Sequence, residues 1–308
     1  MSKNISRRDF IAFGAGVATT IGGALALSQW ASRDVPISRP AGNKVNVFLH
    51  IPKTGGTSLR EHIMDNVKAH QITMPERPEN IHHLKKNYSH YLNRHDYIYV
   101  RGHFANDWQR FLNDYMQETQ CFTMLRDPIA RFRSSYQYQV ENWLTKGSYI
   151  ESVAKRTPQN LSDVIDIFDA DALLPVYRNN EFFFEYNDGM TRRLCGAGWN
   201  NPYRQTTPAM LDAAKANLKS RFKIIGVTEE YNKFLFLLKN EFDWDIQPSI
   251  RKNVAKKKMH VSDIDRDKIA ALNQLDIELH AYATQLSERL FEELSPAQQQ
   301  AYESFITL

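Results

Sequence analysis

Residues 45–60 read V-N-V-F-L-H-I-P-K-T-G-G-T-S-L-R, and this stretch decides which fold the chain adopts. Its β-branched and aromatic start, 45–49, is typical of a buried strand. Pro52 ends that strand because proline lacks the N–H group that a strand ladder requires. The glycine pair 55–56 permits a tight turn in which successive backbone N–H groups point at one anion. A threonine and a serine then favour a helix start, so the stretch predicts a strand, an anion-binding loop that contains Lys53, and a helix.

The position of the lysine separates this loop from the loop that binds nucleoside triphosphates. A Walker loop reads G-x-x-x-x-G-K-[ST], with its lysine after the second glycine, whereas Lys53 precedes the glycine pair. The order P-K-T-G-G-T-S at 52–58 instead resembles the 5′-phosphosulfate loop of sulfotransferases that use PAPS (3′-phosphoadenosine 5′-phosphosulfate). A glycine turn with a surface lysine is the alternative interpretation. The resemblance implies that the donor is bound by Lys53, Thr54, Gly55, Gly56, Thr57 and Ser58.

A second strand is predicted at 97–100, and Arg101-Gly102-His103-Phe104 follows it. In open α/β sheets the chemistry gathers beyond the carboxyl ends of the strands, so His103 is expected on the same edge as Lys53. A histidine in that place can take a proton from an acceptor hydroxyl. The segment G-H-F resembles the catalytic-histidine segment of the uronyl and heparan 2-O-sulfotransferases, although a purely structural histidine is the alternative.

A third strand, 120–125, leads through Arg126-Asp127-Pro128 into a predicted helix. Arg126 and Ser134 are eight residues apart, and both can reach a single phosphate from the strand end and the helix. The pattern R-D-P-x-x-R-x-x-S-x-Y at 126–136 resembles the 3′-phosphate motif of the same sulfotransferases, which implies that Arg126 and Ser134 bind the donor. Arg131, which is part of this motif, and Arg133 have a solvated helix face as their alternative interpretation.

The rest of the chain carries weaker signals. Helices are predicted at 160–170 and 208–222, a strand at 223–227 with Thr228 as the cap of the next helix, and one amphipathic helix from Ile269 to Leu290. Residues 187–194 read N-D-G-M-T-R-R-L and resemble a T-R-x-L segment of bacterial sulfotransferases, and are expected either along the acceptor groove or on a salt-bridged surface. The basic run 251–258 is expected to close over the 3′-phosphate, to attract a polyanion, or to be ordinary solvated surface.

Composition narrows the class of protein. The 308 residues are 42% hydrophobic and 12% aromatic, which is ample for a large core and excludes a disordered chain. A net charge of +4 does not demand nucleic acid, and no nucleic-acid partner is predicted. The two cysteines are too few for a disulfide framework, and no histidine–cysteine pattern indicates zinc, so no metal is expected.

The amino-terminal residues 1–31 are interpreted as a targeting segment. The sequence S-R-R-D-F-I at 6–11 resembles a twin-arginine export signal, and the uncharged stretch 11–31 is long enough to span a bilayer. The basic residues before it predict that the amino end stays in the cytoplasm. We therefore expect a protein that is membrane-anchored or exported to the periplasm or a lumen, with a cytoplasmic protein as the alternative. Residues 32–44 are interpreted as a linker.

The predicted fold is a single α/β domain over 45–308, with a P-loop-like, mostly parallel sheet flanked by helices on both faces. The resemblance implies a sulfotransferase that moves a sulfuryl group from PAPS to an acceptor hydroxyl, on a carbohydrate or another hydroxyl-bearing molecule, and releases PAP (3′-phosphoadenosine 5′-phosphate). Lys53 and His103 are the expected catalytic residues, with His103 as the general base. Two alternatives remain open, a P-loop kinase or NTPase and a non-catalytic protein that binds a nucleotide or glycan.

Overall fold

The structure is a computed structural model that describes residues 44–66, 70–73, 97–103, 119–156, 160–177, 181–196, 198–249 and 259–307. The chain divides into two units, 1–39 and 40–308, and all described residues belong to the second. The predicted targeting segment 1–31 and the basic run 251–258 lie outside the described residues, as does the linker apart from its last residue. Among the residues that are described, no helix is both long and apolar enough to cross a bilayer.

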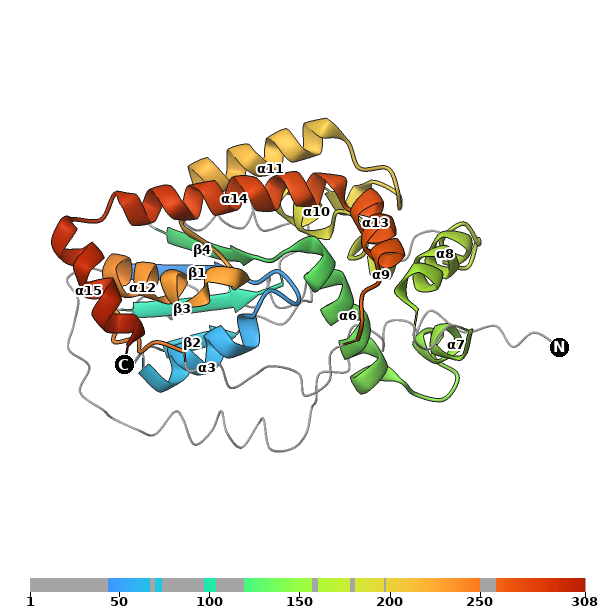
Figure 1. The fold of residues 1–308 in the computed structure, drawn as a ribbon, viewed down its shortest axis with the longest axis horizontal. Coiled ribbons are helices and arrows are strands. Elements are labelled where there is room, and N and C mark those ends of the chain that lie inside the picture. Colours follow the sequence, from blue (N-terminus) through green and yellow to red (C-terminus); the bar gives the residue numbers. More distant parts are fainter. Residues whose placement is uncertain are drawn as a thin grey trace. The chain divides into compact units, whose positions relative to one another are not determined.

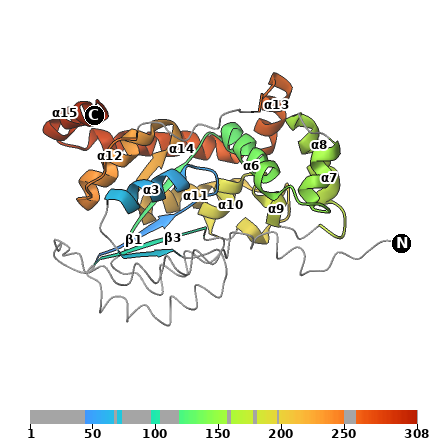
Figure 2. The ribbon, with the colours of Figure 1, turned by 90° about the horizontal axis from the view of Figure 1, so that it is seen from below.

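The described residues form one five-stranded sheet in the order β2-β3-β1-β4-β5. Every neighbouring pair is parallel, so the strands end at the same edge, and Figure 2 shows β1 and β3 side by side. The first strand is central because it carries the buried apolar run that the sequence predicts. The strands are β1 (Lys44–Leu49), β2 (His70–Thr73), β3 (Tyr97–Gly102), β4 (Thr119–Leu125) and β5 (Phe222–Val227).

Helices cover both faces of the sheet, which confirms the predicted fold class (Figure 1). The helices expected at 160–170 and 208–222 are present as α8 and α11. The helical elements are α3 (Gly56–Asn66), α6 (Pro128–Trp143), α7 (Tyr149–Arg156), α8 (Leu161–Ala172), α9 (Glu181–Phe184), α10 (Gly189–Cys195), η1 (Gly198–Asn200), α11 (Pro208–Arg221), η2 (Thr228–Glu230), α12 (Tyr231–Phe242), α13 (Asp263–Leu272), α14 (Gln274–Glu292) and α15 (Pro296–Ile306).

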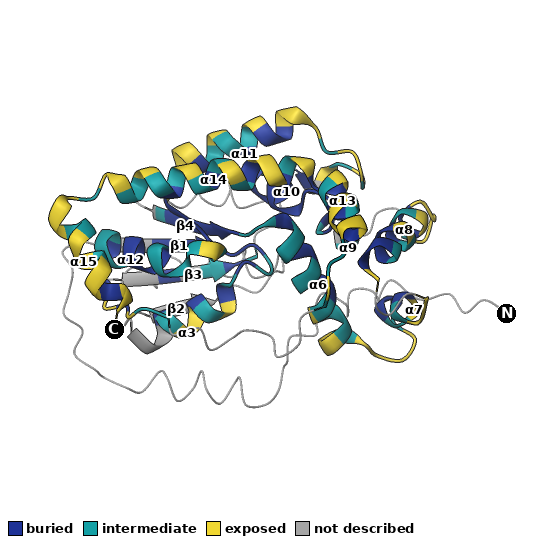
Figure 3. Cartoon of the chain, in the orientation of Figure 1, coloured by how far each residue is buried: buried dark blue, intermediate teal, exposed yellow. Residues whose placement is uncertain are grey.

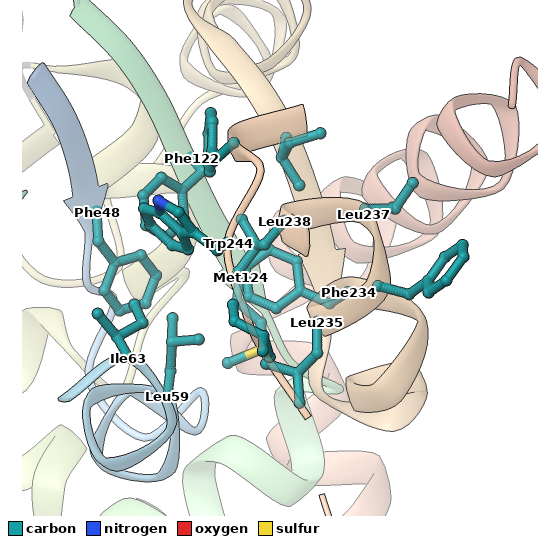
Figure 4. Packing of buried hydrophobic residues seen from close by; sticks show 14 of the residues in the cluster. Phe48, Leu59, Ile63, Phe122, Met124, Phe234, Leu235, Leu237, Leu238 and Trp244 are labelled. Carbon is teal, nitrogen blue, oxygen red and sulfur yellow. The ribbon is translucent and has the colours of Figure 1, made fainter. Parts of the chain in front are cut away.

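The core consists of two layers because successive side chains of a strand point to opposite faces. On β1, Val47 and Leu49 pack against α10, α11 and α14. Phe48 points the other way, into a layer built with α3, α12 and α15, and Figure 4 shows its packing near Leu59 and Ile63 of α3. Figure 3 shows the resulting pattern, with buried strands and exposed residues along the outer sides of α11 and α14. The central strand is thereby held rigidly on both faces.

The carboxyl-terminal amphipathic helix predicted from Ile269 to Leu290 is two helices, α13 and α14, which break at Asn273. The Asn273 amide is buried, donating to the carbonyls of Tyr186 and Ile269 at 3.1 and 3.0 Å. Its oxygen accepts from the Asp188 N–H group at 3.0 Å. A buried amide with satisfied partners stabilises this break, and the apolar spacing does not reveal it.

Residues 187–194 do not form a salt-bridged surface, because this segment is buried in α10 and the turn before it, while a place along the acceptor groove stays a prediction. The Arg192 side chain is fully buried, and its guanidinium donates to backbone carbonyls at 2.7–2.9 Å. A guanidinium with several carbonyl acceptors holds a loop together without binding a ligand. Its acceptors are the carbonyls of Asn187, Gly198, Asn201 and Pro202.

Candidate active site

The loop between β1 and α3 has the backbone of an anion-binding turn. Lys53 and Gly55 adopt left-handed φ angles of 67° and 90°. The helix begins at Gly56, where the Leu59 N–H group donates to the Gly55 carbonyl at 3.1 Å. The N–H groups of the first helical turn have no acceptor within their own helix, so they point toward an anion at the loop. These residues fit the phosphosulfate group that the sequence resemblance implies.

The two glycines are required for different reasons. At Gly55 the left-handed φ favours glycine, and an added Cβ would lie 3.0 Å from the Met124 Cε. At Gly56 an added Cβ would lie only 2.0 Å from Nε2 of His50, so the histidine ring occupies the space where any other side chain would begin. The second glycine is therefore required by the packing of a neighbouring ring, which the sequence pattern alone does not indicate.

Two residues from neighbouring strands brace the loop. The Arg126 guanidinium, just after β4, donates to the Lys53 carbonyl at 3.0 Å. The Thr228 hydroxyl, just after β5, donates to the carbonyls of Thr54 and Leu125 at 2.9 and 3.0 Å. Thr228 was expected to cap a helix but instead ties the loop to two strand ends. Ser134 is half-buried near the end of the second turn of α6. Its assignment to the site rests on this position on the helix.

The ammonium of Lys53 lies 3.9 Å from the centre of the Tyr138 ring on α6. An aromatic face attracts a cation, so this contact holds the lysine side chain at the mouth of the loop. Burial, followed by the positive charge of Arg126, lowers the pKa of Lys53 from 10.5 to about 8, and Glu141 opposes this shift. The ammonium is thus charged at neutral pH but loses its proton more easily than an exposed lysine.

This lowered pKa predicts a basic limb in the pH–rate profile. The ratio kcat/KM for PAPS reports ionisations of the free enzyme. The sequence resemblance implies that the protonated lysine is the active form, and kcat/KM is then expected to fall as pH rises through about 8. Bound donor anion raises the lysine pKa, so the limb in kcat should lie at higher pH. Rates of sulfuryl transfer from about pH 6 to about pH 10 measure both limbs. A kcat/KM profile that stays flat above pH 8 would contradict a charged Lys53 in the reaction.

His103 follows β3 directly and lies beside His50. Its Nδ1 donates to the His50 carbonyl at 2.8 Å, and since a carbonyl only accepts, the proton is on Nδ1 and the lone pair on Nε2. Burial and the positive charges of Arg193 and Arg101 lower the pKa of His103 to about 3, while Glu185 opposes this. The imidazole is therefore neutral at pH 7, which is the form that a general base needs.

A buried ion-pair cluster lies between α6, α9 and α10. Glu185 accepts from Arg131 Nη1 at 3.2 Å and from Arg193 Nε at 3.0 Å. A solvated face was the alternative for Arg131, but it is 2% exposed, because it lies three residues after the buried Pro128 and four before the buried Ser135 on α6. That helical spacing is the sequence signal that identifies Arg131. No local pattern identifies Glu185 and Arg193, whose charges both act on His103.

Comparisons with known proteins show the family of this chain. A model of the sulfotransferase family matches residues 41–283. Heparan-sulfate 6-O-sulfotransferase 2 of Gallus gallus is 26% identical over 282 residues, covering 80% of this chain and 67% of the relative. Heparan-sulfate 6-O-sulfotransferase 2 of Homo sapiens is 24% identical, covering 80% and 45%, and heparan-sulfate 6-O-sulfotransferase 3 of Mus musculus is 26% identical, covering 81% and 59%. These relatives are named 6-O-sulfotransferases, whereas the resemblance of the G-H-F segment at 102–104 was to 2-O-sulfotransferases.

The chain spans only 45–67% of the length of these relatives. A solved sulfotransferase from Alicyclobacillus acidocaldarius aligns with 84% of this chain and 99% of its own, at 14% identity and a TM-score of 0.40. The family model matches well over half of the sequence, including the loop, His103 and the Arg126 motif. The protein therefore belongs to the sulfotransferase family.

Proposed function

We propose that this protein transfers a sulfuryl group from PAPS to a hydroxyl of a carbohydrate. One observation carries the proposal. The loop with Lys53 and the neutral His103 meet at the carboxyl edge of the sheet, because the His50 carbonyl that accepts from His103 is three residues from Lys53. Membership of the sulfotransferase family supports PAPS as the donor. The relatives named heparan-sulfate 6-O-sulfotransferases support a carbohydrate acceptor.

PAPS supplies the sulfuryl group, and the residues of this chain bind and orient the reactants. The N–H groups of the loop and of the first turn of α3 bind the phosphosulfate. The Lys53 ammonium neutralises the negative charge that develops on the bridging oxygen as the leaving group departs. The braces from Arg126 and Thr228 hold the loop backbone in place, so that these donors are already aligned before reaction.

His103 takes the proton from the acceptor hydroxyl at its Nε2. The bond from Nδ1 to the His50 carbonyl fixes which nitrogen carries the lone pair. The imidazolium that forms is opposed by the charges of Arg101 and Arg193 and favoured by Glu185. The low pKa makes the His103 ring a weak base before the donor binds. The negative charge of the bound donor is therefore needed to raise the pKa of His103.

A transfer assay tests this function. The full-length protein is incubated with sulfur-35-labelled PAPS and, separately, with heparan sulfate, desulfated heparin and 4-nitrophenol. Labelling of a glycan that is lost in the His103→Ala variant supports the proposal. A protein that binds PAP but labels no acceptor is a non-catalytic binding protein. Mg²⁺-dependent hydrolysis of ATP without transfer from PAPS would identify the kinase or NTPase alternative instead.

Donor recognition predicts a preference for PAP over AMP. Hydrogen bonds to a charged group contribute about 1.5–3 kcal/mol, so the 3′-phosphate should improve affinity at least about tenfold. Arg126→Ala should remove most of this preference. Because Arg126 also braces the loop, Thr228→Val is the matched control: it removes another brace but should keep the preference. Calorimetry measures the affinities, and equal binding of PAP and AMP by the wild type would contradict the donor assignment.

We also propose that residues 1–31 direct the protein to the membrane and that a catalytic domain begins near residue 45. The export-like residues 6–11 and the uncharged stretch 11–31 support this. Fractionation of cells that express the full chain or residues 41–308 tests it. The full chain is expected in the membrane or an exported fraction, and the shorter one in the cytoplasm with donor binding intact. Full-length protein found wholly in the soluble cytoplasm would remove the targeting proposal.

A further inference from the structure

We propose that the side chain of His50 is a positioning residue that sets the orientation of the His103 base. The inference rests on the proposed function. His50 directly follows β1 and precedes the loop, and it is 6% exposed. Its backbone carbonyl already fixes the tautomer of His103, but any residue at this position has a carbonyl. The question is therefore what the imidazole itself adds.

The His50 ring is the third member of a column of rings that runs from the core to the base. Phe122 stacks on Phe48 at 5.2 Å between ring centres, and both belong to the core layer in Figure 4. Phe48 stacks on His50 at 5.4 Å, and His50 faces His103 at 4.1 Å with a 32° tilt. The column connects His103 to the buried core of the sheet, and packing of this kind restricts rotation of the outermost ring.

Two further contacts fix the His50 ring itself. The Arg101 guanidinium lies 3.2 Å from His50 Nδ1, and because a guanidinium only donates, Nδ1 accepts and the proton is on Nε2. That edge of the ring lies against Gly56, where an added Cβ would be 2.0 Å from Nε2. The two adjacent histidines thus have opposite tautomers. His50 is held in one orientation between Arg101, Gly56 and His103.

The charge state of His50 also suits this role. Burial, the neighbouring His103 and the positive charges of Arg101, Arg193 and Lys53 lower the pKa of His50 well below the ordinary value, so the ring is neutral. A neutral ring beside His103 allows that base to accept a proton, whereas a second imidazolium at 4.1 Å would repel it. The His50 ring does not pass protons onward, because the Nδ1–H group of His103 donates to the backbone carbonyl of His50 and not to the His50 ring.

The kinetic test uses two substitutions that separate the properties of the ring. His50→Phe keeps the stacking but cannot accept from Arg101, and His50→Asn keeps an acceptor but loses the stacking. Misplacing a reacting group by about 1 Å can cost about 100-fold, so both variants should lower kcat by about 10- to 100-fold. The KM for PAPS and the affinity for PAP should change less than about threefold. His280→Phe, at a half-buried histidine on α14, is the matched control and should leave kcat unchanged.

A residue that acts through His103 has no effect when His103 is absent. In the His103→Ala background, adding His50→Phe should therefore leave the residual rate unchanged. A kcat that is unaltered in both single variants would overturn the proposal. So would a further drop in rate in the double variant, or a fall in PAP affinity that parallels kcat, because either would mean that His50 merely supports the loop.

A measurement independent of turnover distinguishes this inference from the proposed function. Nitrogen-15 NMR of histidine-labelled protein, with resonances assigned by His50→Phe and His103→Ala, reports which ring nitrogen carries the proton. The expected result at pH 7 is Nε2–H for His50 and Nδ1–H for His103. A protonated or Nδ1–H His50 would overturn the inference even in an active enzyme. The expected tautomers in a protein that transfers no sulfuryl group would instead refute the function, and with it the positioning role.

Discussion

Replacing Lys53 with alanine is expected to slow sulfuryl transfer by orders of magnitude while PAP affinity falls by about tenfold or less, near 1.4 kcal/mol. The reason is that the charge which Lys53 meets grows only as the sulfuryl group leaves. In the ground state the bridging oxygen carries little charge, and the N–H groups of the loop already hold the phosphosulfate. An interaction that is stronger in the transition state than in the ground state affects turnover more than binding.

The measurement is single-turnover transfer alongside titration with PAP, on wild type, Lys53→Ala and Lys53→Arg. Arginine is not expected to restore the rate, because its charge is spread over a planar guanidinium and is not concentrated as in the lysine ammonium. The loop is also tight, since residue 53 has a left-handed backbone. Lys155→Ala, at an exposed lysine on α7, is the control for loss of a positive charge. Intact transfer in Lys53→Ala would overturn both the mechanism and the donor assignment.

Replacing His103 with alanine is expected to lower turnover by about 10²–10⁴-fold, the usual contribution of a positioned general base. PAP binding should change little, because the proposed role of the imidazole is to take a proton from the acceptor, and its Nδ1 donates to the His50 carbonyl and not to a group that binds the donor. A steady-state transfer assay measures turnover, and titration with PAP measures its affinity. Added imidazole should recover part of the lost rate by filling the space that the ring leaves. If turnover survives within a few-fold, His103 is structural and another residue takes the proton.

Local sequence was enough to predict the loop, the strand ends and the place of Arg126 beside them. Proline, lysine and paired glycines constrain the backbone wherever they occur, so the turn before α3 is visible without any tertiary information. Short β-branched runs indicated the strands, and the rule that parallel strands end at one edge placed His103 near Lys53. Arg126 was found by its motif, and the structure adds that its guanidinium also braces the Lys53 carbonyl.

Contacts between distant segments were not predictable in this way. Thr228 looked like a helix cap, because a threonine oxygen commonly accepts from the first N–H groups of a helix. Its hydroxyl can also donate to a carbonyl, and only the fold brings those of Thr54 and Leu125 within reach. Arg192 looked like a surface or groove residue, since arginine is seldom buried without acceptors, and its carbonyl acceptors come from a turn that folds back on it. Glu185 had no signal at all until α6 and α10 brought Arg131 and Arg193 to it.

The sequence by itself determined which residues can bind an anion and which can take a proton, because those properties belong to residue types and to turns of a few residues. Only the tertiary structure decided which residues meet. The parallel register of β1 and β3 pairs Leu49 with Gly102, and it therefore brings the next residues, His50 and His103, face to face. A shift of that register by one residue would leave every local pattern unchanged and separate the two rings, since register depends on how a whole strand packs.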